Sequence, residues 1–254
     1  MKDRKGLLMR VGIDKTDGEY NAPINPSTND YIYMPILQGK DDFIPGMKTS
    51  YNDLSSYFES WSQRNNADIQ FPQHLNNKTC HLDPDFEFST YGDQATGRGL
   101  RVADLKEWDL LAFFASFKPI NKCDHNLIYA LYGIMVVDKI FKVSDMPENE
   151  YHKNAHTRIM NRNGDHLVVF AKPSLSGRFD RAIPIGEFRN RSYRVKNEIL
   201  DAWGNIGVKD GFIQRSVCPP WFEKPDLFLK WLESQQVKLI NSNWSQDSFC
   251  RQDY

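Results

Sequence analysis

Asp109-Leu-Leu-Ala-Phe-Phe-Ala-Ser-Phe117 is the stretch of sequence that decides the fold. It is a short apolar run rich in aromatic residues, and such runs are typical of strands buried on both faces of a sheet. Residues 127–137 and 166–171 have the same character and predict two more strands. Residues 7–13 and 31–36 are bounded by Asp, Asn, Gly and Pro, and they predict strands near the start of the chain.

Helical patterns are fewer than strand patterns. Ser50 precedes a set of apolar residues at helical spacing, with an acidic residue three positions later as in a capping box, so residues 50–64 are predicted to form an amphipathic helix. Residues 104–108 resemble one helical turn, and further helices are predicted at about 194–202 and 225–235.

Strands therefore outnumber helices, and the two do not alternate regularly. This pattern predicts a single α+β domain with a mixed or antiparallel central sheet and a few flanking helices. The domain is expected to occupy residues 1–238, and the polar residues 239–254 are expected to form a poorly packed C-terminal tail.

The composition is that of a globular protein. Of the 254 residues, 40% are hydrophobic and 26% are charged, which excludes a largely disordered chain. The apolar runs fall short of the roughly 18 residues needed to cross a bilayer, and no signal peptide is readable, so no membrane association and a cytoplasmic location are expected. The four cysteines form no Cys-x-x-Cys pair, which favours buried reduced thiols over a zinc ribbon or a redox motif.

The charges are distributed unevenly along the chain. Residues 151–196 contain ten Lys and Arg against three Asp and Glu, a local surplus of +7, although the whole chain has a formal net charge of −1. Such asymmetry predicts a positive face for phosphates. The alternative is a solvated surface whose charges are balanced by acidic residues from the rest of the chain.

The sharpest local motif is His81-Leu-Asp-Pro-Asp85. In an extended chain alternate side chains share a face, so His81, Asp83 and Asp85 would point the same way. An imidazole and two carboxylates could hold a divalent metal ion, or could act as a general base with an orienting partner. The alternative is that the aspartates cap a turn around Pro84 and that His81 is hydrogen-bonded locally.

Two further segments contain polar residues that could bind a ligand. Residues 91–99 are rich in glycine, which lets the backbone approach a ligand, and Arg98 could bind a phosphate there. The segment lacks the Lys and Ser/Thr of a P-loop. His152 and His156 would share a helix face, but Lys153 stands where a zinc-protease motif needs its glutamate, which excludes that motif.

Candidate residues also occur near both ends of the chain. Asp14 follows the first predicted strand, a common place both for site residues and for turn-forming residues. Residues 211–221 are dense in polar donors before a double proline, and Trp221 could stack on a base or belong to the core.

In order along the chain, these segments resemble the family called nucleotide modification associated domain, type three, over about residues 7–222. The matching pieces are Val11-Gly-Ile-Asp14, Pro23-Ile24, Pro35-Ile36, His81-Leu-Asp-Pro-Asp-Phe86, Tyr91-Gly-Asp93, Arg98, Asp109-Leu-Leu-Ala-Phe-Phe-Ala115, Asn154-Ala-His156, Ser176-Gly-Arg178, Gln214-Arg-Ser216 and Pro219-Pro220. Cys218 departs from the expected pattern. The resemblance implies intracellular work on nucleic acid or nucleotides, and it places polar signature positions at Asp14, His81, Asp83, Asp85, Asp93, Arg98, His156, Arg178 and Gln214.

The leading hypothesis is an enzyme that modifies a base in DNA or RNA, or a nucleotide, with a transferase as the class considered. The predicted catalytic residues are Asp14, His81, Asp83 and Asp85; the last three would hold a divalent metal ion if the reaction uses one. The predicted phosphate- or nucleotide-binding residues are Asp93, Arg98, His156, Arg178, Gln214, Arg215 and Trp221.

Two other classes remain open from the sequence. One is a non-catalytic module that binds a modified base or nucleotide and recruits a partner base-modifying enzyme. The other is a nuclease built on the same acidic residues, although His-x-Asp-x-Asp has no companion Lys at a readable spacing.

Overall fold

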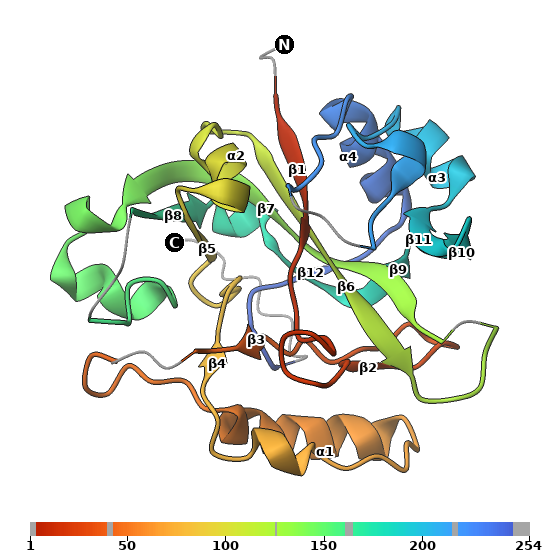
Figure 1. Cartoon of the computed structure of the whole chain (residues 1–254), viewed down its shortest axis with the longest axis horizontal. Coiled ribbons are helices and arrows are strands. Elements are labelled where there is room, and N and C mark those ends of the chain that lie inside the picture. Colours follow the sequence, from red (N-terminus) through yellow and green to blue (C-terminus); the bar gives the residue numbers. More distant parts are fainter. Residues whose placement is uncertain (1–3, 40–42, 125, 161–164, 215–217, 246–254) are drawn as a thin grey trace.

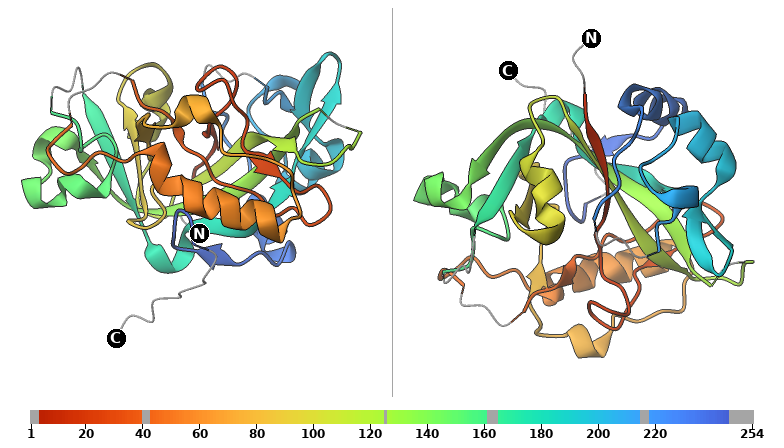
Figure 2. Two further views of the ribbon diagram at one scale, coloured as in Figure 1. Left: turned by 90° about the horizontal axis from the view of Figure 1, so that it is seen from below. Right: turned by 45° about the horizontal axis from the view of Figure 1, so that its top comes forward.

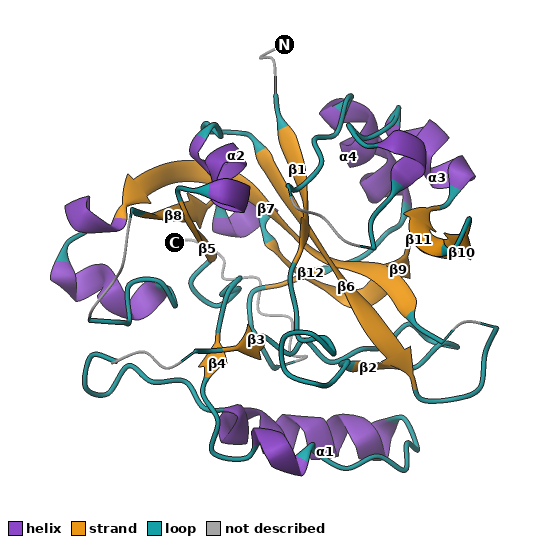
Figure 3. Ribbon diagram, in the orientation of Figure 1, coloured by secondary structure: helices purple, strands orange, loops and turns teal. Residues whose placement is uncertain are grey.

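The structure is a computed structural model that describes residues 4–39, 43–124, 126–160, 165–214 and 218–245. Its centre is an eight-stranded mixed sheet. Helices lie around this sheet, as Figures 1 and 3 show. This architecture confirms the predicted α+β class.

Strand β7 (Ile128–Lys142) is the longest strand and organises the sheet. Along one edge it pairs antiparallel with β6 (Leu110–Pro119), which in turn pairs in parallel with β1 (Gly6–Arg10). Along the other edge it pairs first with β9 (Gly177–Pro184) and then with β8 (His166–Ala171), both antiparallel. The sheet therefore divides into two branches beyond β7.

The remaining strands are short. The sheet is completed by β5 (Thr90–Gln94) beside β8, β2 (Pro23–Ile24) beside β6 and β12 (Leu239–Ile240) beside β9. Two separate ribbons consist of β3 (Ile36–Leu37) with β4 (Cys80–His81), and β10 (Gly186–Arg189) with β11 (Ser192–Val195).

The α-helices are short and lie at the periphery: α1 (Ser55–Arg64), α2 (Leu100–Ala103), α3 (Asn197–Trp203) and α4 (Pro225–Ser234). The 3-10 helices are Tyr51–Leu54, Gln73–Leu75, Gly97–Gly99, Val143–Asp145, Glu148–Lys153, Pro173–Leu175 and Lys209–Gly211. No helix among the described residues is both long enough and apolar enough to span a membrane.

Both faces of the sheet are buried, which explains the continuous apolar run in β6. Leu111 and Phe113 pack into one core, whereas Leu110, Ala112 and Phe114 pack into the other. The first core is covered by α1, and the second by α3 and α4. In Figure 1, α1 runs along the bottom of the molecule and α3 and α4 lie together at the upper right; Figure 2 gives two further views.

A bulge in β7 reaches toward the end of β1. Phe113 pairs with Gly133 and Phe114 with Leu131, so Tyr132 is an extra residue between them. The Tyr132 hydroxyl donates to the backbone oxygen of Val11 at 3.1 Å. This contact fixes the chain where it leaves β1.

The structure confirms some predicted elements and corrects others. The capping box at Ser50 is present, since the backbone N–H of Ser50 donates to Asp53 Oδ2 at 2.9 Å, and helical structure continues to Arg64. The helix expected over 194–202 begins only at Asn197, because Arg194 pairs with Glu187 in the β10–β11 ribbon.

Three other strand and turn predictions need correction. The first strand ends at Arg10 rather than at residue 13. Residues 31–36 contain only an isolated bridge at Tyr31 and the start of β3. Residues 104–108 form turns, and the helix lies before them as α2.

The C-terminal segment packs more closely than expected. Residues 239–245 are not a loose tail, because Leu239 and Ile240 pair with β9 and the Asn243 side chain is buried. Residues 246–254 lie outside the described residues. Cys80 is buried as predicted, whereas Cys218 is exposed, which corrects the expectation of buried thiols at that position.

Candidate functional site

A pocket of about 520 Å³ opens where the chain leaves β1, beside β4 and β5. Its polar lining includes Arg10, Asp14, His81, Asp83, Asp93 and His156. Most small-molecule sites occupy about 300–1,000 Å³, so the pocket has the size of a site for one small ligand.

Three of these side chains converge and are called here the His-Asp cluster: His81, Asp83 and His156. The Nε2 atoms of His81 and His156 are 3.2 Å apart. Asp83 Oδ2 lies 3.6 Å from His156 Nε2 and 3.9 Å from His81 Nε2. The three residues could hold a metal ion, since their ligand atoms all lie within 4.8 Å of one another.

His81 is positioned by the β3–β4 ribbon. It is the last residue of β4 and pairs with Ile36 across the ribbon. Its Nδ1 lies 2.5 Å from Gln38 Oε1, just beyond β3. A carbonyl oxygen only accepts hydrogen bonds, so Nδ1 carries the proton and a neutral His81 ring has its lone pair on Nε2.

Asp83 is held by β5. The backbone N–H of Gly92 lies 3.0 and 2.9 Å from its two oxygens, and Asn154 Nδ2 donates to Oδ1 at 3.0 Å. A Cβ atom at Gly92 would lie 2.4 Å from Cδ2 of His156. The glycine in Tyr91-Gly92-Asp93 is therefore required by the close approach of the His156 ring.

His156 is positioned by Asn154 and His166. Asn154 is fully buried, and its Oδ1 accepts from the backbone N–H of His156 at 2.9 Å. His156 Nδ1 lies 2.7 Å from Nδ1 of His166, the first residue of β8. The rings of His81, His156 and His166 thus form a continuous chain of contacts.

Burial sets the protonation states in the cluster. It lowers the pKa of His81 from 6.5 to about 4, assisted by the charges of Arg158 and His166. It also lowers the pKa of His156 well below its ordinary value, with His81 and His166 adding to the effect. Burial raises the pKa of Asp83 well above its ordinary value, although the hydrogen bonds from Gly92 and Asn154 oppose the rise. Both imidazoles are therefore neutral near pH 7.

The rim of the pocket is acidic. Arg10 is the arginine among the described residues that line the pocket, and it forms an ion pair with Asp14 at 2.7 Å. Asp93 Oδ2 accepts from the Tyr91 hydroxyl at 3.0 Å. Asp17 and Asp83 complete the set, so four aspartates face one arginine among the described lining residues.

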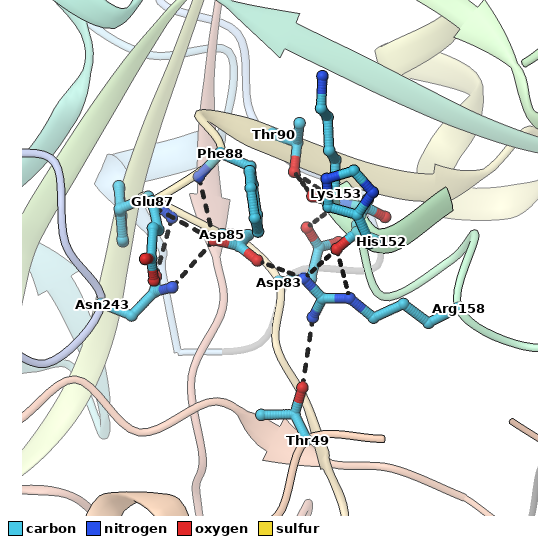
Figure 4. Close-up of polar contacts among 12 residues, drawn as sticks. Thr49, Asp83, Asp85, Glu87, Phe88, Thr90, His152, Lys153, Arg158 and Asn243 are labelled. Carbon is cyan, nitrogen blue, oxygen red and sulfur yellow. Dashed lines mark hydrogen bonds and ion pairs between the residues drawn. The ribbon is translucent and has the colours of Figure 1, made fainter. Parts of the chain in front are cut away.

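Asp85 does not join His81 and Asp83 on one face, which corrects that prediction. The backbone N–H of Asp83 donates to His81 O at 2.8 Å, so the chain turns and strand alternation stops. Asp85 is buried, pairs with Arg158 Nη2 at 2.8 Å and accepts from Asn243 Nδ2 at 2.9 Å (Figure 4). It links segments of the fold and does not line the pocket.

Other predicted binding residues also lie away from the pocket lining. Arg178 is buried and its Nε donates to Ser242 O at 2.6 Å. Gln214 Oε1 accepts from the backbone N–H of Tyr193 at 2.9 Å, while its backbone oxygen accepts from Arg10. Trp221 forms a bridge with Leu7 of β1. The Arg98 side chain and Arg215 lie outside the described part of the chain.

The basic surplus of residues 151–196 is partly neutralised. Arg158 and Arg178 are buried, and Lys172 Nζ lies 2.9 Å from both Glu107 and Asp138. Arg189 and Arg194 pair with Asp210, and Lys153 pairs with Glu150. Acidic residues therefore balance several of these cations, as in the alternative, but Arg191 is exposed, so a positive face for phosphates stays a prediction.

Comparison with known proteins identifies the family. A family model described as nucleotide modification associated domain 3 (Nmad3) matches residues 5–238. The chain belongs to the Nmad3 family. No curated protein and no solved structure matches it.

The Nmad3 match confirms the resemblance seen in the sequence and connects the chain with nucleotide modification. It spans all three residues of the His-Asp cluster. It ends before Asn243, although Asn243 is buried against the loop that follows Asp83.

Sequence reasoning missed several residues around the pocket of this Nmad3 chain. Arg10 reads as the polar end of a strand, and Gln38 as part of a loop. His166 stands as one polar residue at the start of an apolar strand, which is a weak signal of an inward-facing group. His156, which is predicted to bind nucleotide, lies beside His81 and Asp83 and lines the pocket.

Proposed function

We propose that this Nmad3 chain is an enzyme that modifies a nucleobase or a nucleotide, with the pocket as its active site. One observation carries the proposal: the His-Asp cluster lines a pocket in a chain whose family is associated with nucleotide modification. Perturbed titratable groups in a pocket are the usual mark of a reactive centre.

The pocket favours one nucleotide, or one base taken out of a strand, over a duplex lying along the surface. Its volume of about 520 Å³ suits a single small ligand. Several Lys and Arg side chains of residues 151–196 that could contact a long phosphate backbone are buried or paired. An extruded base would reach the pocket in the manner of other base-modifying enzymes.

The acidic rim suits the hydrogen-bond donors of a base. The carboxylates of Asp14 and Asp93 are acceptors, and carboxylates recognise exocyclic amino groups such as N4 of cytosine. The lone pair on His81 Nε2 faces the same pocket. In this scheme Asp83 and His156 complete the reactive centre and the rim orients the base.

Nucleoside analysis tests the proposal whichever co-substrate the reaction uses. DNA, RNA and free nucleotides would be extracted from cells expressing the wild-type chain, Asp83→Asn or His152→Gln. Each fraction would be digested to nucleosides, and the nucleoside masses would be compared. His152 is the matched control, since it lies four residues before His156 and does not line the pocket.

A mass-shifted nucleoside is expected with the wild type and His152→Gln and is expected to be absent with Asp83→Asn. If no nucleoside changes while purified protein binds a nucleotide, the chain is a binding module rather than an enzyme. If neither occurs, the pocket is not a nucleotide site.

A further inference from the structure

We infer that His81 Nε2, Asp83 Oδ2 and His156 Nε2 bind one divalent first-row transition-metal ion and leave its remaining coordination positions open to the pocket. The inference deepens the proposed function and rests on it for the ion's catalytic use, but the binding of the ion is testable by itself. Four observations lead to it.

The first observation is the spacing of the donor atoms. Ligand atoms about 2.0–2.2 Å from one ion, at tetrahedral or octahedral angles, lie about 2.8–3.6 Å apart. The nitrogen–nitrogen distance in the cluster is 3.2 Å, and the nitrogen–oxygen distances are 3.6 and 3.9 Å. Small side-chain movements would bring all three atoms onto one ion.

The second observation is the proton arrangement along the histidine chain. Gln38 fixes the proton of His81 on Nδ1, so His81 Nε2 has a lone pair. Without an ion, His156 Nε2 donates to it, and His166 Nδ1 then donates to His156 Nδ1. With an ion, the proton of His156 moves from Nε2 to Nδ1 and is donated to His166 Nδ1, whose own proton moves to its Nε2. The Nε2 lone pairs of His81 and His156 then both face the ion.

The third observation is charge. Four aspartates and one arginine are the charged side chains among the described residues lining the pocket. Carboxylates that face one another across a pocket repel, and a divalent cation relieves this repulsion. Arg10 forms an ion pair with one of them, Asp14.

The fourth observation is the donor set, which selects the class of ion. Mg²⁺ and Ca²⁺ prefer oxygen ligands, whereas two imidazoles and one carboxylate suit Fe²⁺, Mn²⁺, Co²⁺ or Zn²⁺. Three protein ligands leave positions for water or substrate, as in catalytic rather than structural metal sites. The pocket lies on the side where those positions would open.

Gln38 and His166 follow as positioning residues. Each contacts the ring nitrogen opposite the proposed ligand atom, at 2.5 Å for His81 and 2.7 Å for His156. Partners of this kind fix the tautomer and orientation of a ligating histidine, and losing one typically weakens metal binding 10- to 100-fold.

Metal titration tests the inference with no nucleotide present. The purified full chain would be stripped with a chelator and titrated with Co²⁺, followed by visible absorption, and Zn²⁺, Mn²⁺ and Fe²⁺ would compete for the site. One Co²⁺ per chain is expected. His156→Gln and Asp83→Asn should lose it, and His152→Gln should bind like the wild type. Millimolar Mg²⁺ should not displace Co²⁺.

His166→Leu and Gln38→Leu should bind Co²⁺ about 10- to 100-fold more weakly and shift its absorption bands. Circular dichroism and thermal unfolding of each variant separate lost ligands from lost fold. Substoichiometric binding, or equal affinity in wild type and in folded Asp83→Asn, would overturn the inference. Nucleoside analysis remains an independent readout, so either proposal can fail alone.

Discussion

The carboxylate of Asp83 receives the backbone N–H of Gly92 almost symmetrically, at 3.0 and 2.9 Å from its two oxygens. This contact joins two short sequence motifs, His81-Leu-Asp-Pro-Asp85 and Tyr91-Gly92-Asp93, into one structural unit. The His156 ring lies against the other side of Gly92, where no side chain could fit. Gly92 is thus a backbone member of the site.

Gly92→Ala is expected to disrupt the His-Asp cluster. The new Cβ would lie 2.4 Å from His156 Cδ2 and 2.6 Å from Asn154 Oδ1, so both side chains would have to move. Crowding of this kind costs about 1–3 kcal/mol of unfolding free energy. Urea unfolding and Co²⁺ titration measure the two effects.

Gly207→Ala is the matched control, because its Cβ would meet only Trp221 O at 3.8 Å. Equal behaviour of the two variants would contradict the close packing at Gly92.

Substitutions of Asp85 and of Asp83 are expected to have different effects on the stability of the fold and on the site. Asp85→Ala leaves the buried Arg158 guanidinium without its 2.8 Å partner, and breaking such a pair costs about 3–5 kcal/mol. Asp83→Asn is expected to keep the fold and lose the site. Chemical denaturation of both variants checks this difference.

Asp226→Ala provides the reference for an exposed pair. Its 3.4 Å contact with Arg4 lies at the surface, so a change of about 0–1 kcal/mol is expected. A similar small loss for Asp85→Ala would show that the Arg158 pair does not support the fold.

Nucleotide binding is expected to depend little on salt. Several cations of residues 151–196 are buried or paired, as with Lys172 between Glu107 and Asp138, which reduces the number available to contact a phosphate backbone. Calorimetric titration with AMP, GMP, CMP and UMP should show less than about a threefold change between 50 and 200 mM salt. A protein with 6–10 phosphate contacts loses about 10³–10⁵ in affinity over that range, and such a loss with an oligonucleotide would instead indicate a nucleic-acid surface.

Cys80 is expected to make stability fall at high pH. Burial raises the pKa of its thiol from 9.0 to about 12, so between these values the unfolded chain releases a proton that the folded chain retains. The free energy of unfolding is unaffected by this difference below pH 9 and falls as the pH rises toward 12. At pH 10.5 it is lower by about 2 kcal/mol.

Urea unfolding of wild type and Cys80→Ala at pH 8 and 10.5 measures this contribution, because the difference between the two proteins should shrink at the higher pH. Cys218→Ala, at an exposed position, should track the wild type. A constant difference between wild type and Cys80→Ala would show that the thiol ionises equally in both states.

The helices and strands could be predicted from the sequence better than the site could. The apolar run in β6 and the cap at Ser50 are local signals, and both led to the observed elements. The importance of His81 and Asp83 could also be read locally. The role of His156 could not, because it depends on β5 and β8 pairing so that Gly92 and His166 meet it.

Asp85 illustrates why pattern reasoning failed at another position. Alternation along an extended chain placed Asp85 beside Asp83, but the turn after His81 ended the alternation. The position of Asp85 then depends on Arg158 and Asn243, which are distant in the chain, and spacing does not encode such contacts.

Asn243 gives the C-terminal segment a role in assembly. Its side chain donates to Asp85 at 2.9 Å and accepts from the backbone N–H of Phe86 at 2.8 Å, directly beyond the Asp83 turn. During synthesis, the loop that bears Asp83 therefore remains without this support until residue 243 has left the ribosome. A truncation at residue 238, where the family match ends, would remove the same support permanently.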